Sequence, residues 1–137
     1  MQEEKALQLV SLAQAQKLKE LGFDYSTIEI FNGSVADYSL TKKNHNDFEF
    51  PTSRPTVSLA LKWFRNVRGI ENAVETRLND DWTTNYDSMW WHPKDKDGEY
   101  FRVCGIEFPT YGEAESALLD ALLEYCENNK QEKQVGN

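Results

Sequence analysis

The sequence predicts a single α+β domain in the order α-β-β-α-β-β-β-α, with an antiparallel sheet packed by helices. Two segments, about 56–68 and 111–127, carry apolar faces at helical spacing, and three alternating segments joined by short links lie between them. A chain of 137 residues with 39% apolar and 12% aromatic residues can bury one core without disulfide or metal staples. We expect the domain to span residues 1–127 and residues 128–137 to form a frayed polar tail.

The first helix is expected over about 12–21. Ser11 and Gln14 have the spacing of a capping box, and Gly22 follows the last apolar residue of the stripe, Leu21. The residues that precede Ser11 fit neither a helical nor a strand period. They therefore either extend this helix or form a strand that leads into it.

A β-hairpin should follow this helix. Residues 27–31 alternate polar and apolar side chains, Asn32-Gly33 is a favoured pair for a type I′ turn, and residues 34–40 form a return strand. From Thr41 to Arg54 the chain is polar and rich in turn-forming residues, which indicates a long connection on the surface.

Residues 55–127 predict a helix, a three-strand meander and a second helix. Pro55 and Thr56 open the first of these helices, Gly69 ends it, and its apolar face consists of Val57, Ala60, Leu61, Phe64 and Val67. Thr110 and Glu113 form a capping box for the final helix, whose apolar face consists of Tyr111, Ala114, Leu118, Ala121, Leu122 and Tyr125.

The meander strands are expected over 70–78, 82–91 and 99–108, paired antiparallel because their links are short. A first turn centred on Asp80 gives one core face, with Ile70, Val74 and Leu78 opposite Trp90, Tyr86 and Trp82. A second turn near Lys96 adds Tyr100, Cys104 and Ile106 to that face, which the two long helices would cover.

The opposite face of the meander carries a second apolar patch, formed by Met89, Trp91, Phe101 and Val103. A core with one helical layer does not require this patch. Either the amino-terminal hairpin or helix covers it, or it is a surface for a protein partner or for self-association as a homodimer.

The excess of acidic residues bears on the choice of partner. The 15 basic and 23 acidic side chains give a net charge of −8, and the pI is about 4.8. This charge opposes phosphate backbones, so we do not expect generic binding to nucleic acids.

Two groups of charged residues are candidate binding sites. Lys62, Arg65 and Arg68, with Trp63 close by, could hold a phosphate or a nucleotide, or else be solvated or paired with acids such as Glu71. An acidic ridge lies opposite the apolar face of the final helix and consists of Glu113, Asp120, Glu124 and Glu127. This ridge is either a solvated face or a mimic of nucleic-acid phosphates that docks on a basic partner.

The sequence contains no strong catalytic signature. None of the patterns GxSxG, GxxxxGK[ST], GxGxxG or HExxH occurs, so we expect no enzyme activity and no catalytic residues. With His45, His92, Cys104 and Cys126 far apart, we expect no metal and no cofactor, and we interpret both thiols as core residues. The apolar runs are too short to cross a bilayer, and the start of the chain does not read as a signal peptide, so a cytoplasmic location is expected.

Three stretches resemble small uncharacterised accessory proteins of phages and prophages from gut bacteria. They begin with Leu18-Lys19-Glu20-Leu21-Gly22-Phe23, continue with Pro55-Thr56 through Ala60-Leu61-Lys62-Trp63-Phe64-Arg65, and end with Thr110-Tyr111-Gly112-Glu113-Ala114-Glu115. The resemblance implies a phage accessory protein in the cytoplasm of a bacterial host. We therefore expect a non-enzymatic binding or inhibitor protein that acts through protein-protein contacts. The alternatives are a nucleotide-binding sponge that uses the aromatic and basic site, or a small enzyme without a recognisable motif.

Overall fold

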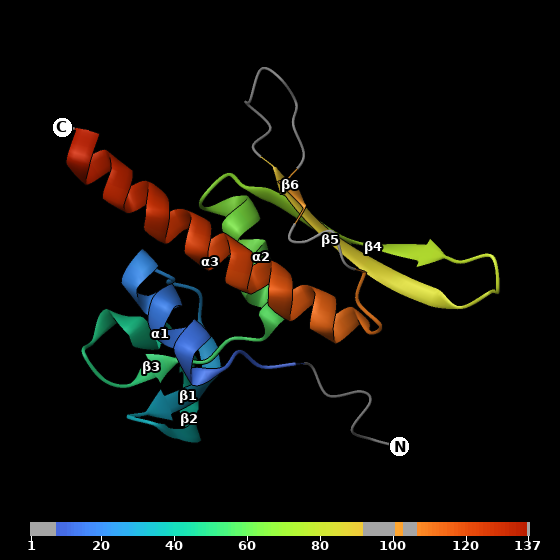
Figure 1. Cartoon of the computed structure of the whole chain (residues 1–137). Coiled ribbons are helices and arrows are strands. Elements are labelled where there is room, and N and C mark those ends of the chain that lie inside the picture. Colours follow the sequence, from blue (N-terminus) through green and yellow to red (C-terminus); the bar gives the residue numbers. More distant parts are fainter. Residues whose placement is uncertain (1–7, 92–100, 103–106, 137) are drawn as a thin grey trace. The chain divides into compact units, whose positions relative to one another are not determined.

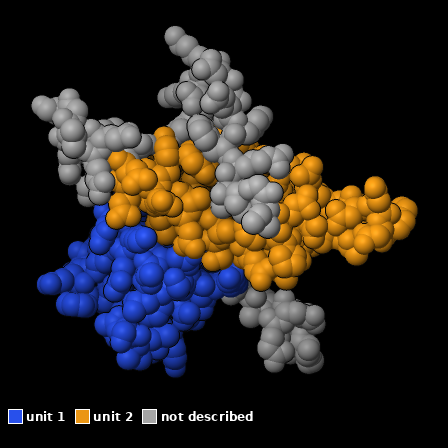
Figure 2. Space-filling model, viewed as in Figure 1, with its two compact units in different colours: residues 1–63 blue, residues 64–137 orange. Residues whose placement is uncertain are grey.

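A computed structural model describes residues 8–91, 101–102 and 107–136 (Figure 1). It confirms the α+β class, with helices and antiparallel strands in nearly the expected order. The chain divides into two compact units, residues 1–63 and 64–137 (Figure 2). Each unit has its own three-stranded antiparallel sheet, in the strand orders β2-β1-β3 and β4-β5-β6, where we expected one sheet.

In the first unit, helix α1 (Leu12–Leu21) begins and ends as predicted. The Ser11 hydroxyl accepts a hydrogen bond from the Gln14 amide at 3.1 Å, and the Gln14 side chain accepts one from the Ser11 amide at 2.9 Å. Residues 8–10 do not extend this helix. The Val10 amide donates to the Pro55 carbonyl at 3.0 Å and the Val57 amide donates to Gln8, so this segment is extended beside residues 55–57.

The predicted hairpin is formed by β1 (Thr27–Asn32) and β2 (Val35–Lys43), but its turn differs from the expected type. Asn32 pairs with Val35, so Gly33 and Ser34 form the two-residue loop. Within this loop only Gly33 has a positive φ, 62°, whereas a type I′ turn needs two positive φ angles. The glycine at the first loop position is instead typical of a type II′ turn.

The stretch from Thr41 to Arg54, expected as a surface connection, is exposed over about half of its residues but contains regular structure. It completes β2 and contains a 3₁₀ helix, η2 (His45–Asp47), and a short strand, β3 (Thr52–Ser53), which pairs with β1. His45 and Ser53 are buried, with the His45 Nε2 atom 3.0 Å from the Thr27 carbonyl. Hydrogen bonds to distant backbone groups make it possible to bury these polar side chains.

The boundary between the units falls within α2 (Val57–Asn66), and the second unit continues with β4 (Glu71–Leu78), β5 (Thr84–Trp91), β6 (Phe101–Arg102) and α3 (Tyr111–Gly136). We expected a frayed polar tail from residue 128, and in the structure α3 continues to Gly136. Residues 128–134 are polar but contain several good helix formers and no glycine or proline, so the helix can propagate without an apolar face.

Helix α3 packs on the predicted core face of β4 and β5. The Ser88 hydroxyl donates to the Ala114 carbonyl at 2.7 Å, and the Trp90 and Tyr125 rings lie 4.5 Å apart between centroids. The buried residues of α3 are Ala114, Leu118, Leu119, Leu122, Leu123 and Cys126. Tyr111, expected on this face, is half exposed.

Both expected registers of the meander need correction. Leu78 pairs with Thr84 and Val74 with Ser88, so the first turn is centred on Asp81 rather than Asp80. Trp90 pairs with Phe101, one residue from the register that a turn near Lys96 gives. A one-residue difference exchanges the two faces of a strand, so Phe101 no longer groups with Met89.

Candidate functional site

The outer half of the β4–β5 hairpin is highly exposed. The hairpin extends beyond the part that α3 covers, and Figure 1 and Figure 2 both show this projection. Near its base the strands carry the buried residues Asn72, Ser88 and Trp90. From Glu75 to Thr84 nearly every side chain is exposed.

Hydrogen bonds across residues 79–83 fix the turn at the hairpin tip. The Asn79 amide donates to the Thr83 carbonyl at 2.9 Å, and the Trp82 amide donates to the Asn79 carbonyl at 3.0 Å. The Asp81 carboxylate accepts from the Thr83 hydroxyl at 2.6 Å and from the Thr83 amide at 3.1 Å. These two bonds to Thr83 hold the pKa of Asp81 below its usual value, because they favour the ionised carboxylate.

This turn holds Trp82 in the left-handed backbone region, with a φ of 69°, and leaves its side chain 80% exposed. A positive φ is sterically costly for a bulky residue and persists only where surrounding bonds impose it. Leu78, at the end of β4, is 62% exposed. The tip is therefore an ordered turn that presents large apolar side chains to solvent.

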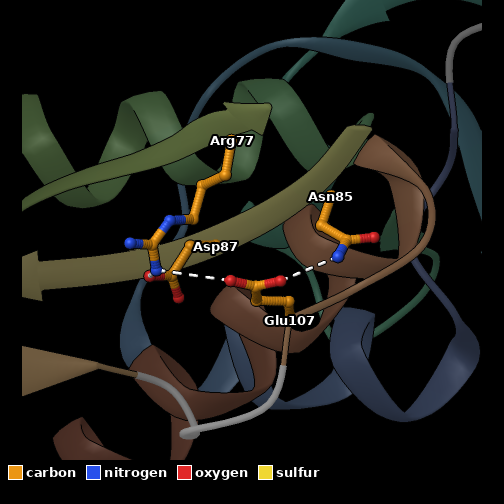
Figure 3. A network of polar contacts seen from close by, with 4 residues as sticks. All are labelled: Arg77, Asn85, Asp87 and Glu107. Carbon is orange, nitrogen blue, oxygen red and sulfur yellow. Dashed lines mark hydrogen bonds and ion pairs between the residues drawn. The ribbon is translucent and has the colours of Figure 1, made fainter. Parts of the chain in front are cut away.

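A polar network lies nearer the base, on the sheet face opposite α3 (Figure 3). The Arg77 guanidinium lies 3.6 Å from the Asp87 carboxylate and 3.4 Å from that of Glu107. The Asn85 amide donates to the other Glu107 oxygen at 2.7 Å. Arg77 therefore stands between two carboxylates and offsets their repulsion.

The structure supports a structural role for this network. Two hydrogen bonds between the backbones of Tyr86 and Phe108, at 2.8 and 2.9 Å, join the segment that contains Glu107 to β5. The Asp87 side chain is only 3% exposed, which leaves a substrate little access to it. We interpret the network as a clamp that fixes the base of the hairpin rather than as an acid-base pair.

The predicted nucleotide site is not assembled around Trp63 as expected. Trp63 is 1% exposed, its Nε1 group donates to the Asp24 carboxylate at 3.1 Å, and its ring contacts that of Phe23. A buried indole cannot stack on a base, so this role for Trp63 was wrong. Arg65 donates to the Asn72 side chain at 2.8 Å, while Lys62 and Arg68 are exposed.

The other predicted surfaces are placed only in part. Met89 and Trp91 are half-buried on β5, and Phe101 pairs with Trp90 rather than with Trp91. Val103 lies outside the described residues. The four-residue patch therefore stays a prediction, although Phe101 does not have the register that we expected. The acidic ridge, in contrast, lies wholly within the described residues. All four of its residues are exposed on α3: Glu113, Asp120, Glu124 and Glu127.

Cys126 is buried, as expected for a core thiol, whereas Cys104 lies outside the described residues. Burial raises the pKa of the Cys126 thiol, against a smaller opposite effect of Arg68. Such a thiol is a poor nucleophile. In the part of the chain that is described, no three His, Cys, Asp or Glu side chains lie together as a metal site would need.

Strand alternation alone placed Trp82 and Leu78 in the core and so missed the tip. The run Asn79-Asp80-Asp81 followed by Thr83 contained the necessary signal. Asn, Asp and Thr side chains bond to nearby backbone amides and favour turns, and here they extend the turn to include Trp82.

Comparisons with known proteins gave no match to a family model, to a curated protein or to a solved structure. None of the described helices combines the length and the apolar character needed to cross a bilayer.

Proposed function

We propose that this is a non-enzymatic binding protein that acts through protein-protein contacts, with the β4–β5 hairpin tip as its contact. The observation that carries the proposal is Trp82, which is 80% exposed in a left-handed conformation fixed by the turn. Tryptophan is the residue most enriched among those that dominate binding energy at protein interfaces. A tip that is already ordered loses little conformational entropy when it binds.

Charge favours a partner with a basic rim around an apolar pocket. Asp80 and Asp81 are both exposed in the turn and directly precede Trp82. Residues 64–137 contain 8 basic and 15 acidic side chains, so this unit carries −7 of the net −8. Nucleic-acid backbones and anionic membrane surfaces are repelled by such a charge, whereas basic protein surfaces are attracted.

The resemblance to phage accessory proteins adds the biological setting of the proposal. In that setting the partner is a protein of a bacterial host, met in the host cytoplasm, and the bound state inhibits or redirects it. The exposed acidic ridge on α3 would assist the approach to a basic partner by long-range attraction.

The test is quantitative capture from a bacterial lysate with the parent protein and two variants, read by mass spectrometry. Trp82→Ala removes the tip side chain, and Val67→Ala is the matched control because Val67 is also an exposed apolar residue of the second unit. The proposal predicts a protein retained by the parent and by Val67→Ala but lost with Trp82→Ala. A partner retained equally by all three, or a co-purified nucleotide without a protein, would contradict it.

A further inference from the structure

Strand β4 of the second unit is a free sheet edge. It lies at one end of the strand order β4-β5-β6, and among the described residues no strand pairs with its other side. Its eight residues pair with β5 in an unbroken register and include no lysine, proline or glycine. Bulges, lysine and proline commonly protect an edge strand against pairing with another chain. β4 has none of these features, and from Glu75 to Leu78 all of its residues are exposed.

The hydrogen bonds of the neighbouring strand show which backbone groups of β4 point outward. The amide and the carbonyl of Tyr86 both bond to Phe108, at 2.9 and 2.8 Å. Tyr86 therefore makes no ladder bonds to Thr76, the residue of β4 that it pairs with. In such a pair the N–H and C=O groups of Thr76 point away from β5, to the free side. The same holds for Val74 and Leu78, which lie two residues away in either direction.

A glutamate on this edge has an unfavourable neighbour within its own hairpin. Glu75 lies directly opposite Asp87 in the ladder. Like charges in opposite positions destabilise a pair of strands. Arg77 offsets the charge of Asp87, but within the described part of the chain Glu75 makes no ion pair. A positive charge on the other side of Glu75, brought by an added strand, would offset this repulsion.

We propose that β4 pairs antiparallel with β4 of a second copy of this chain, with the two Thr76 residues opposite each other on the two-fold axis. The outward groups of Thr76 then make reciprocal backbone hydrogen bonds across the axis, and Val74 of each copy pairs in the same way with Leu78 of the other. Between these pairs, Glu75 of each copy lies opposite Arg77 of the other. This is a non-hydrogen-bonded position, where opposite Cα atoms are closest, at about 4.5 Å.

Both faces of the joined sheet are complementary in this register. Glu75 and Arg77 are two residues apart in a strand without a bulge, so their side chains lie on the same face, the one opposite α3. Both contacts of Arg77 within its own chain use the Nη1 atom, and a guanidinium has several more N–H donors for a carboxylate of the second copy. On the other face Leu78, which is 62% exposed, meets Val74 of the second copy. Two-fold symmetry makes each of these contacts twice.

The charges along β4 favour a second copy over a basic partner. Residues 64–137 contain 8 basic and 15 acidic side chains, and the resulting net charge of −7 would by itself attract a basic protein. A uniformly basic strand, however, would place a cation opposite Arg77 as well as opposite Glu75. A second copy supplies an arginine for the glutamate and a glutamate for the arginine, at the required spacing. The repulsion between the two acidic units is long-range and is screened beyond about 8 Å at physiological ionic strength.

The test reverses the charge of Glu75 and measures the dimer of the full chain by sedimentation equilibrium. The parent should be in monomer–dimer equilibrium. Glu75→Arg should raise the dimer dissociation constant by about tenfold or more, because it places like charges opposite each other at two symmetry-related positions. In the monomer the same change places a cation opposite Asp87, so the fold should be retained. Glu124→Arg is the matched control, since it changes an exposed acid of the same unit by the same charge and should not raise the dissociation constant.

A second measurement locates the contact on the edge of β4. Thr76→Pro removes an N–H that makes no bond to β5, which is a position where an edge strand tolerates proline, and it should abolish the dimer. In the parent, hydrogen exchange of the Thr76 amide, followed by NMR, should slow as the protein concentration is raised through the dissociation constant. Far-ultraviolet circular dichroism checks that each variant is folded.

Four results would each overturn the proposal. They are a parent that is monomeric at every concentration, a folded Glu75→Arg or Thr76→Pro variant that dimerises like the parent, and exchange of the Thr76 amide that does not depend on concentration. The fourth is an equal loss of the dimer with Glu124→Arg, because the overall charge rather than the pairing of β4 would then control association.

Discussion

Replacing Arg77 by methionine should destabilise the second unit, and the loss should come from Asp87 more than from Glu107. The two carboxylates lie at nearly equal distances from the guanidinium, 3.6 and 3.4 Å, but their side chains are 3% and 35% exposed. For unit charges at this separation, Coulomb's law gives about 1 kcal/mol in water and about 5 kcal/mol at an effective dielectric constant of 20. Burial, rather than distance, should therefore decide the strength of each pair.

We expect a coupling free energy of about 2 kcal/mol between Arg77 and Asp87, because Arg77 itself is half exposed and a fully buried pair would give more. Between Arg77 and Glu107 we expect less than about 1 kcal/mol, falling further in high salt. Double-mutant cycles with Arg77→Met, Asp87→Asn and Glu107→Gln measure both values by urea unfolding. Fluorescence and circular dichroism transitions should coincide, so that the unfolding can be treated as two-state. Equal couplings, or a larger one to Glu107, would refute the argument from burial.

Three further predictions concern the core, the tip and the thiol. Leu118→Ala should cost about 3–5 kcal/mol in urea unfolding and Leu78→Ala less than about 0.5, since the first side chain is buried and the second is exposed; similar losses would contradict this packing. By NMR, Asp81 should titrate below its usual pKa of 3.8, so its contribution to stability is present at neutral pH and lost as pH falls through the lowered value. Thr83→Val removes the hydroxyl bond but keeps the amide bond, so it should raise that pKa only part of the way toward its usual value. Iodoacetamide should label Cys126 only after unfolding, and rapid labelling of the folded chain would show the thiol to be accessible.

Elements specified by local interactions could be predicted from the sequence. The capping box of Ser11 and Gln14 fixes the start of α1 through bonds three residues apart, and both ends of this helix were predicted correctly. The same holds for α3, whose buried Leu118 and Leu122 follow from helical periodicity. Such signals lie within a few residues of the structure that they specify.

Elements that depend on distant partners could not be predicted in this way. The two residues of β3 show no period of their own, and the buried Ser53 amide is satisfied by the Asn46 side chain at 2.9 Å. The burial of Trp63 depends on Asp24, 39 residues earlier in the chain. Neither contact changes the local composition. The polar residues were therefore predicted to lie at the surface, and Trp63 was predicted to be available for stacking on a nucleotide.

The candidate site was missed for a different reason. Alternation along β5 was read correctly at Trp90, whose face α3 covers. The error was the length of the turn, which moved Trp82 from the expected core to the exposed tip. A shift of two residues keeps the parity of every pair, so the periodicity could not reveal it.

The affinity of the captured partner for Trp82→Ala, measured by isothermal titration calorimetry beside the parent and Val67→Ala, tests the central claim most directly. If the tip is the contact, Trp82→Ala should weaken binding by about 30-fold or more, equivalent to about 2 kcal/mol, as for a tryptophan that dominates an interface. Val67→Ala should bind within about twofold of the parent. Parent-like affinity of a folded Trp82→Ala variant would contradict the claim and place the contact elsewhere on the molecule.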